Sequence, residues 1–287
     1  WDQAPVCVEK DTELLLAMLG EAGTKGTFLA IGWLAEKYPR LIRRISEQGH
    51  EIGCHGYYHR LIYEQSAAQF REEIRRCRKI LQEISGQEVL CFRAPGFSMK
   101  RQCFWAYHIL VEEGIRIDVS IVPAPRDHGG VENLSPDPFL LHTESGPLQV
   151  FPVSVMKCLG RAMPFSGGGY LRFFPMPFIE YGIRQNHNAQ RPVMTYIHPR
   201  EINPDQPRLP LPLKKRFKYY VGLNSTQRKL QYLLRHYAFG TVSQVMANLQ
   251  GLKSYQLCGC DQNYEIFALS PNRFSEDENP ERQGITV

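Results

Sequence analysis

The feature that most constrains the fold is a regular alternation of amphipathic helical segments with short apolar strand segments. Helices are expected over about 12–22, 33–48, 67–84 and 100–113, and strands over 27–31, 51–54, 88–92 and 115–120. A glycine ends each of these helices. Such alternation is typical of βα units, whose strands run parallel in one sheet. The first half of the chain therefore predicts an α/β fold, a closed or nearly closed parallel (β/α) barrel, with an open doubly wound sheet as the alternative.

The second half of the sequence is less regular. A long loop is expected over 123–147, strands over 148–153 and 192–197, and helices over 225–236 and 242–249. The polar, acidic stretch beyond Ser270 has the composition of a disordered tail. Since no linker interrupts the chain, we expect one barrel domain over residues 1–250 and a partly disordered tail over 251–287.

Charge and hydropathy bear on the partners. The 287 residues carry a formal net charge of +5, which is small for this length and indicates no nucleic-acid partner. No run approaches the roughly 18 apolar residues of a membrane span. The densest basic run, 214–218, precedes two tyrosines. A solvated helix face is favoured there over contact with an acidic glycan. The oligomeric state is not predicted.

The eight cysteines form no regular framework. Several lie in apolar stretches such as Val89-Leu90-Cys91-Phe92, which favours free buried thiols in a reducing compartment over disulfides. Cys258-Gly259-Cys260 is only a weak metal or redox signal, because no second pair lies nearby. These thiols predict a cytoplasmic location.

Reactive side chains follow the predicted strands. His55 and His59 follow strand 51–54, Arg93 follows 88–92, Asp118 lies near the end of 115–120, and His198 follows 192–197. Active sites of parallel barrels form at the carboxyl ends of the strands, so we expect these side chains to converge at one rim. His50 begins its strand, and we expect it at the opposite rim in a structural role.

Each of these residues has a chemical and a structural interpretation. His55 and His59 have the i, i+4 spacing that lets two imidazoles on one helical turn bind one metal ion, but they can also cap a polar loop. His198 is placed to exchange a proton near neutral pH, or it is a core histidine held by a carbonyl. Arg93 orients a carboxylate or forms a rim salt bridge, and Asp118 is functional or caps a turn.

Several motifs, in this order, resemble the NodB-homology polysaccharide deacetylases, carbohydrate esterase family 4. They are Gly49-His50-Glu51-Ile52, His55-Gly56-Tyr57-Tyr58-His59, Arg93-Ala94-Pro95-Gly96-Phe97-Ser98, Phe151-Pro152 and Tyr196-Ile197-His198-Pro199. The stretch from Leu159 to Arg172 is similar to a branch with an added C-terminal segment, here about 148–250, associated with bacterial exopolysaccharide gene clusters. The likeness covers about residues 8–250.

The resemblance implies a distorted barrel that hydrolyses N-acetyl groups on N-acetylglucosamine-containing polysaccharides, in exopolysaccharide biosynthesis. It implies a divalent metal, zinc being the first candidate, held by one Asp and two His, which are His55 and His59 here. By motif position, Arg93 orients the general base and His198 protonates the leaving amine. The residues expected to bind substrate are Tyr57, Tyr58, Pro95, Asp118 and Tyr170. These roles suit amide hydrolysis, which needs a polarised carbonyl and a protonated leaving group.

One motif of that family is missing from the sequence. A strand ending in two Asp residues, the general base and the third metal ligand, is expected before the helix that starts near Val8. The sequence opens instead with Trp1-Asp2-Gln3-Ala4-Pro5, and neither Asp2 nor Asp11 matches the motif. We therefore expect a barrel without its first strand, in a chain truncated at its N-terminus. The alternative is a degenerate homologue that binds glycan without catalysis, and a metal-dependent phosphoesterase is a distant third.

Overall fold

The structure, a computed structural model, describes residues 7–126, 129–260 and 263–269. The chain divides into two units, each assembled from two separate segments. The sheet unit comprises Thr27–Val153 and Val242–Val287, and the helical unit comprises Trp1–Gly26 and Ser154–Thr241. This differs from the single domain expected over residues 1–250. A linker in the sequence marks a domain boundary only where a unit is one continuous segment. A search for linkers does not find a unit whose two segments are separated in the sequence by the other unit.

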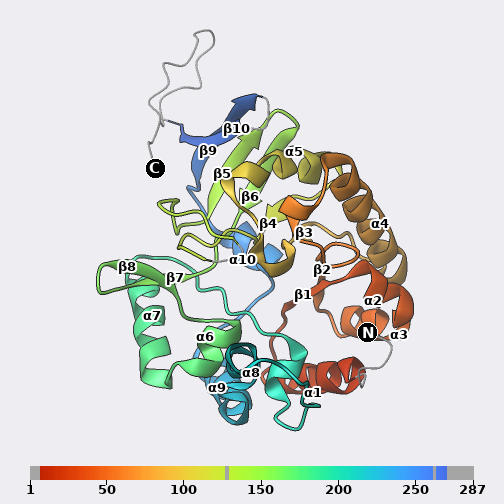
Figure 1. Cartoon of the computed structure of the whole chain (residues 1–287), viewed down its shortest axis with the longest axis vertical. Coiled ribbons are helices and arrows are strands. Elements are labelled where there is room, and N and C mark those ends of the chain that lie inside the picture. The colour runs from red at the N-terminus through yellow and green to blue at the C-terminus, as the bar shows by residue number, and fades with distance from the viewer. Residues whose placement is uncertain (1–6, 127–128, 261–262, 270–287) are drawn as a thin grey trace. The chain divides into compact units, whose positions relative to one another are not determined.

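The sheet unit is organised by one eight-stranded sheet, in the order β1-β2-β3-β4-β6-β5-β9-β10 (Figure 1). Its strands are β1 Thr27–Ala30, β2 Glu51–Cys54, β3 Cys91–Phe92, β4 Ile117–Asp118, β5 Phe139–Thr143, β6 Gly146–Val150, β9 Lys253–Cys260 and β10 Asn263–Ala268. The pairings from β1 through β4 to β6 are parallel, β5 is antiparallel to β6, and β9 is parallel to β5. The α/β class with mainly parallel strands, predicted from the alternation, is confirmed.

The described part of this unit has the α-helices α2 Gly32–Lys37, α3 Pro39–Glu47, α4 Ala67–Ser85, α5 Trp105–Glu112 and α10 Val242–Asn248. One helix was expected over 33–48, and the structure breaks it at Tyr38, whose φ is −128°. The break follows from Pro39, because a proline ring disfavours helical backbone in the residue before it. Ser66 and Gln69 form a capping box at the start of α4, and Gly86 ends it at a φ of +68°.

Two sequence expectations for the sheet unit are corrected. The predicted loop over 123–147 contains β5, which pairs with β6 across a two-residue turn, 144–145. Residues 253–260 and 263–268 were assigned to the tail, but they form the antiparallel strands β9 and β10 within the sheet. In β9 the buried residues Tyr255 and Leu257 alternate with partly exposed ones, and Ile266 is buried in β10. The expectation of disorder beyond Ser270 lies outside the described residues.

Cysteines are mostly buried thiols in this fold. The seven whose side chains the structure describes are all free, as the sequence predicted. Burial raises the pKa of both Cys77 and Cys91 well above the usual value, so neither is a ready nucleophile.

Glu51 links strands β1 and β2 to helix α10 by hydrogen bonds. Its carboxylate accepts hydrogen bonds from the Thr27 hydroxyl (2.5 Å), the Ser243 backbone N–H (3.2 Å) and the Ser243 hydroxyl. Ser243 lies in the first turn of α10, where the helix dipole also favours an acidic group. His50, beside Glu51, packs its ring against Phe28 with 5.1 Å between ring centroids, at the strand end opposite to His55.

The helical unit contains α1 Val8–Glu21, α6 Gly168–Phe173, α7 Met176–Asn188, α8 Leu213–Tyr220 and α9 Leu223–His236. It also holds a two-stranded sheet, β7 Val155–Cys158 with β8 Arg161–Pro164, and the 3₁₀ turn η4 Pro199–Ile202. Its core is formed by Met156, Phe165, Leu171, Ile179, Ile183 and Leu233. Asn203, just after η4, donates to the buried Asp11 carboxylate of α1 at 2.6 Å. That bond joins the N-terminal helix to the rest of the unit.

The predicted strand over 192–197 is wrong, since only an isolated bridge between Gly167 and Tyr196 forms there. Other groups satisfy its backbone: Ser154 accepts from the Met194 N–H at 2.8 Å, and Ser166 donates to the Met194 carbonyl at 2.7 Å. Hydrogen bonds with side-chain hydroxyls therefore take the place of the inter-strand backbone hydrogen bonds that the apolar composition suggested.

We predict that Glu51→Ala destabilises the protein by about 2 kcal/mol, because it leaves the hydroxyl of Thr27 and the N–H of Ser243 without their acceptor. Glu47→Ala, an exposed change at the end of α3, is the matched control and should stay within about 0.5 kcal/mol. Urea unfolding of both variants measures the difference. Equal stabilities would show that Glu51 does not fasten α10.

Candidate active site

The loop after β2 brings His55 and His59 together. Their ring centroids are 5.0 Å apart at an interplanar angle of 78°. The loop is not the helical turn that the i, i+4 spacing suggested, because Gly56 (φ +73°) and His59 (φ +61°) both take left-handed backbone. A left-handed non-glycine residue costs free energy and is characteristic of functional loops. His55 is 6% exposed, whereas His59 is exposed.

A hydrogen bond from His55 sets which ring nitrogen is available as a ligand. His55 Nδ1 lies 2.6 Å from the backbone carbonyl of Arg93, at the end of the neighbouring strand β3. A carbonyl only accepts, so Nδ1 carries the proton and Nε2 carries the lone pair. This is the usual arrangement of a metal-binding histidine, in which the second nitrogen is held by a backbone carbonyl or carboxylate.

The two tyrosines of this loop have different environments. Tyr57 is 3% exposed; its hydroxyl donates to Glu36, and the Arg76 guanidinium lies 3.9 Å from its ring centroid. Burial and the Glu36 carboxylate raise the pKa of Tyr57 to about 12. Tyr58 is 51% exposed, and its N–H donates to Glu73 at 3.4 Å. Of the two side chains, only that of Tyr58 is open to a substrate.

Arg93 and Pro95 lie in the loop that follows β3. Arg93 is 8% exposed, and its guanidinium lies 5.3 Å from the Phe97 ring centroid. Pro95 is buried; a side chain at Gly56 would meet it at 3.6 Å, so it packs against the histidine loop. This buried position favours a role for Pro95 in shaping the histidine loop over a role in contacting the substrate. The role of Arg93 in orienting a base stays a prediction.

Arg126 is a residue that the sequence reasoning missed. Its guanidinium lies 5.2 Å from the same Phe97 ring, which gives this loop a second cation beside Arg93. Arg126 Nη1 is buried and has no hydrogen-bond partner among the described residues. Nothing in the sequence marks it, since it lies in a long irregular stretch far from any motif.

Asp118, predicted to bind substrate, is fully buried. Its carboxyl group accepts from the Ser120 N–H (3.2 Å), the Ser120 hydroxyl and the Tyr107 hydroxyl (3.4 Å). Ser120 in turn accepts from the Ala94 N–H at 2.7 Å. Asp118 therefore supports the Arg93–Pro95 backbone from beneath, through Ser120, and these contacts favour a positioning role over contact with substrate.

Burial raises the pKa of Asp118 to about 7, although the bonds from Ser120 and Tyr107 oppose the rise. In the unfolded chain an Asp titrates near 3.9, so between about pH 4 and pH 7 the folded state binds the extra proton. We predict that this proton makes stability fall as pH rises through that window. Asp118→Asn should flatten that part of the profile by roughly 2–4 kcal/mol, measured by urea unfolding across pH. Parallel profiles for the two proteins would contradict the assignment.

In the helical unit, the partly exposed His198 contacts a buried ion pair. His198 Nδ1 lies 3.1 Å from Glu201 Oε2, which also accepts from the His198 N–H at 2.8 Å. Glu201 Oε1 accepts from Arg172 Nε at 2.9 Å, and Glu201 and Arg172 are 2% and 4% exposed. Burial raises the pKa of Glu201, but the bonds and charge of His198 and Arg172 outweigh it and lower the pKa to about 2. Glu201 is therefore an anion beside the imidazole.

Neither Glu201 nor Arg172 was predicted from the sequence. A signal for Glu201 exists, because Glu three residues after a capping position forms a capping box, and Glu201 does so with His198. Arg172 ends the Leu159–Arg172 stretch that carries part of the resemblance, but no local signal predicts its contact with Glu201, since the two positions are 29 apart. Tyr170, predicted to bind substrate, lies in α6 with its ring against Phe174, 6.1 Å between centroids, and is half-buried.

The glycines before Tyr170 have a packing role. A Cβ at Gly167 would lie 2.1 Å from the Tyr196 ring, and the Gly168 N–H donates to the Tyr196 carbonyl at 2.8 Å. The glycine run therefore lets the segment before His198 approach α6. His198 and Tyr170 belong to the helical unit and His55, His59 and Arg93 to the sheet unit, so convergence at one rim stays a prediction.

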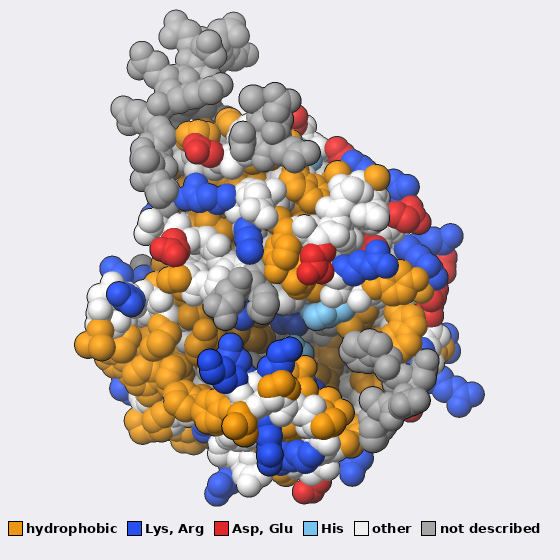
Figure 2. Space-filling model, in the orientation of Figure 1, with side chains coloured by type: hydrophobic (Ala, Val, Ile, Leu, Met, Phe, Trp, Pro, Cys, Tyr) orange, Lys and Arg blue, Asp and Glu red, His pale blue; other side chains and the backbone are white. Residues whose placement is uncertain are grey.

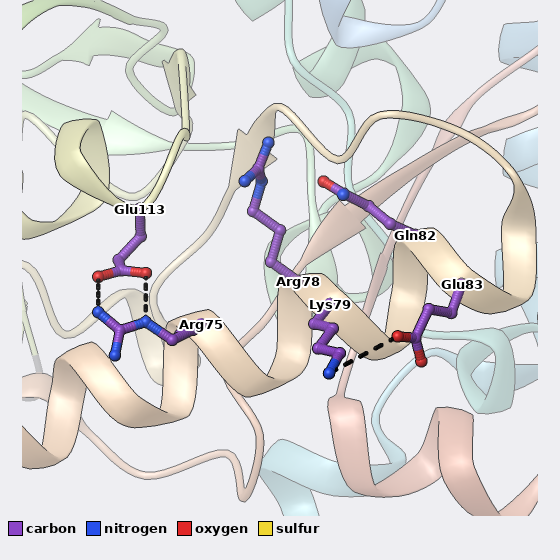
Figure 3. Close-up of a pocket in the computed structure, with 6 residues that line it drawn as sticks. All are labelled: Arg75, Arg78, Lys79, Gln82, Glu83 and Glu113. Carbon is purple, nitrogen blue, oxygen red and sulfur yellow. Dashed lines mark hydrogen bonds and ion pairs between the residues drawn. The ribbon is translucent and has the colours of Figure 1, made fainter.

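One pocket of about 270 Å³ lies elsewhere in the sheet unit, along α4 and the end of α5 (Figure 3). Its charges are largely paired: Arg75 makes two bonds to Glu113, at 3.0 and 2.8 Å, and Lys79 lies 3.9 Å from Glu83. Arg78 donates to the Val89 carbonyl at 2.9 Å. The pocket contains none of the candidate residues, and we assign it no function.

Two protein families match the chain. Residues 1–109 match Polysaccharide deacetylase, and residues 119–247 match a domain of unknown function, DUF3473. The chain is 32% identical over 96 residues to the peptidoglycan-N-acetylglucosamine deacetylase of Bacillus cereus, covering 33% of this chain and 35% of that one. It is 28% identical over 125 residues to the chitooligosaccharide deacetylase of Azorhizobium caulinodans, covering 43% and 58%. The chain thus spans less than two thirds of either relative.

Among solved structures, a Mycobacterium smegmatis protein assigned as a polysaccharide deacetylase superposes with a TM-score of 0.57 at 22% identity. The likeness covers 84% of this chain and 77% of that one, and it shows the fold. The predicted α/β fold of barrel type is confirmed. The match of residues 1–109 to the Polysaccharide deacetylase model confirms the resemblance read from the motifs.

Proposed function

We propose that the chain takes part in metal-dependent hydrolysis of N-acetyl groups on an N-acetylglucosamine-containing polysaccharide. The observation that carries the proposal is the His55–His59 pair, 5.0 Å between ring centroids, beside Arg93 at the strand ends of a deacetylase domain. The two curated relatives act on peptidoglycan and chitooligosaccharide, which supports an N-acetylglucosamine polymer as substrate. A role in exopolysaccharide biosynthesis is part of the proposal and rests on the sequence resemblance.

The two histidines fit a metal as part of a ligand set. The bond from Nδ1 of His55 to the Arg93 carbonyl leaves Nε2 with the lone pair that a metal needs. Catalytic zinc usually has three protein ligands, and no group of three His, Cys, Asp or Glu among residues 7–126, 129–260 and 263–269 is arranged to hold a metal. His55 and His59 therefore supply two ligands. When bound, a divalent metal supplies Lewis-acid polarisation of the amide carbonyl.

His198 is suited to protonate the leaving amine. The Glu201 anion accepts from Nδ1, which fixes the ring so that Nε2 is the nitrogen that gives up the proton. The side chain of His198 is half exposed while Glu201 is buried, so the outer nitrogen faces solvent or substrate. Amines are poor leaving groups, and a proton delivered to the nitrogen as the C–N bond breaks lowers the barrier.

Glycan binding without catalysis is the second candidate. The observation that favours it is that no third His, Cys, Asp or Glu among the described residues joins the histidine pair in a set that could hold a metal. The two functions differ in a direct way, because only the enzyme releases acetate. A module would bind the polymer and leave its acetyl groups intact.

We predict that Zn²⁺ binds at the histidine pair. His55→Ala and His59→Ala should each lower Zn²⁺ affinity by at least about 100-fold, because each removes one ligand. His236→Ala, in an exposed position on α9, is the matched control and should leave the affinity unchanged. Isothermal titration calorimetry measures the three variants. Unchanged affinity in both site variants would place the metal elsewhere.

We predict that His198→Ala lowers kcat for acetate release from an N-acetylglucosamine oligomer by about 10²–10⁴-fold, with Zn²⁺ affinity unchanged. Glu201→Gln should lower kcat at least about 10-fold with little change in KM, because the imidazole loses its anionic partner. The assay uses the 287 residues together with any upstream residues that the gene encodes. Added imidazole should restore part of the activity of His198→Ala only.

Three results would contradict this assignment. Full activity in His198→Ala would remove His198 from the reaction. Loss of Zn²⁺ affinity in His198→Ala would make it a ligand instead of a proton donor. Absence of acetate release by the unaltered protein, with polymer binding intact, would establish the binding module.

A further inference from the structure

The helical unit carries most of the exposed large hydrophobic side chains of the described chain. Of the nine large hydrophobic side chains that are most exposed in the described chain, seven belong to this unit. Five of them lie in or beside α8: Leu213 (82% exposed), Phe217 (58%), Tyr219 (40%), Leu209 (44%) and the neighbouring Phe173 (56%). Phe173 and Phe217 touch, with 6.1 Å between ring centroids. Figure 2 shows hydrophobic and basic side chains gathered over this part of the molecule, with few acidic ones among them.

α8 is amphipathic but buries no side chain. Leu213, Phe217 and Tyr220 have i, i+4 and i+7 spacing and form one apolar stripe along the helix. Four of its eight residues, Lys214, Lys215, Arg216 and Lys218, are basic and exposed. The sequence contains no acidic residue between Asp205 and Asp261, so no neighbouring charge along the chain offsets them. We call α8 with Leu209 and Phe173 the α8 patch.

The α8 patch is held firmly at one end. Arg172 donates to the carbonyls of Lys218, Tyr219 and Val221 at 2.8–3.0 Å, which satisfies the last carbonyls of the helix. Tyr220 accepts from the Leu209 N–H at 2.8 Å and so fastens the preceding Pro-rich segment to the helix end. An exposed apolar stripe on a helix that is anchored in this way indicates a site where a partner binds.

We propose that the α8 patch binds the surface of a membrane rich in anionic phospholipids. A short helix with Leu and Phe on one face and Lys and Arg on the other is the form that lies in the interface between headgroups and acyl chains. The basic side chains match the charge of the lipid headgroups, and the apolar stripe enters the outer acyl region. No described helix is both long and apolar enough to span a bilayer.

An anionic polysaccharide is the competing partner, and two observations count against it. Sugars stack on flat aromatic faces, but the most exposed side chain of the patch is the aliphatic Leu213, 82% exposed. Two of the three aromatic rings of α8 are already covered by a cation: Arg200 lies 4.4 Å from the Tyr219 centroid, and Arg208 lies 4.4 Å from the Tyr220 centroid. The third, Phe217, packs against Phe173. The chemistry of the patch therefore favours lipid.

The test is flotation of the 287-residue chain with phosphatidylcholine vesicles that contain or lack phosphatidylglycerol. We expect binding only when phosphatidylglycerol is present, weakened by salt because surface charges are screened. Lys214→Gln combined with Lys215→Gln should lower the partition coefficient about 30-fold, or about fivefold for each lysine. Leu213→Ser combined with Phe217→Ser should lower it at least about 10-fold, and this loss should persist at low salt.

Leu269→Ser, an exposed apolar change in the sheet unit, is the matched control and should bind as the unaltered chain does. Thermal unfolding checks that the α8 variants are folded. The proposal is overturned if phosphatidylglycerol vesicles bind no protein, or if the Leu213/Phe217 variant binds them as well as the unaltered chain. It is also overturned if an anionic polysaccharide such as polygalacturonate displaces the chain from vesicles and loses affinity in that same variant.

Discussion

The buried ion pair between Arg172 and Glu201 is the interaction on which the helical unit depends. The two groups lie 2.9 Å apart and are almost fully buried, so neither can exchange its partner for water. Removing one partner of such a pair usually costs several kcal/mol, because the other charge stays buried and uncompensated. Through Glu201 the pair orients His198, and through its remaining N–H groups Arg172 caps the end of α8. One arginine thus joins the proposed proton donor to the surface proposed to bind lipid.

In the sheet unit the corresponding constraint is the parallel strand arrangement. β2 and β3 are neighbours, so the residues that follow them meet: the Arg93 N–H donates to the Cys54 carbonyl, and His55 donates to the Arg93 carbonyl. Asp118, the last residue of the next strand β4, and Ser120, just after it, hold the same loop from beneath. The proposed ligand loop and the Arg93 loop are therefore oriented by backbone contacts between strand ends. This is why barrels of parallel strands place reactive groups there.

The sequence was informative wherever local pattern and strand order determine the outcome. Periodicity identified the βα units, and strand ends identified the loops of His55 and Arg93. The sequence was misleading where contacts between distant residues determine the structure. The segment before His198 is apolar like a strand, but the hydroxyls of Ser154 and Ser166 form the hydrogen bonds with its backbone. Glu201 had a weak local signal, whereas Arg172 and Arg126 had none, because their contacts join residues far apart in the chain. Burial of Asp118 and Tyr57 likewise depends on neighbours that a single sequence does not identify.

The central claim is that His55 and His59 are metal ligands whose geometry is set by the strand ends. The most direct measurement is a two-dimensional ¹H–¹⁵N NMR spectrum of the imidazoles, recorded as Zn²⁺ is added. The account predicts that His55 keeps its proton on Nδ1, bonded to the Arg93 carbonyl, while the Nε2 resonance takes the shift of a metal-bound nitrogen. Metal-induced shifts at Nδ1 of His55, or no shift at either histidine, would contradict it.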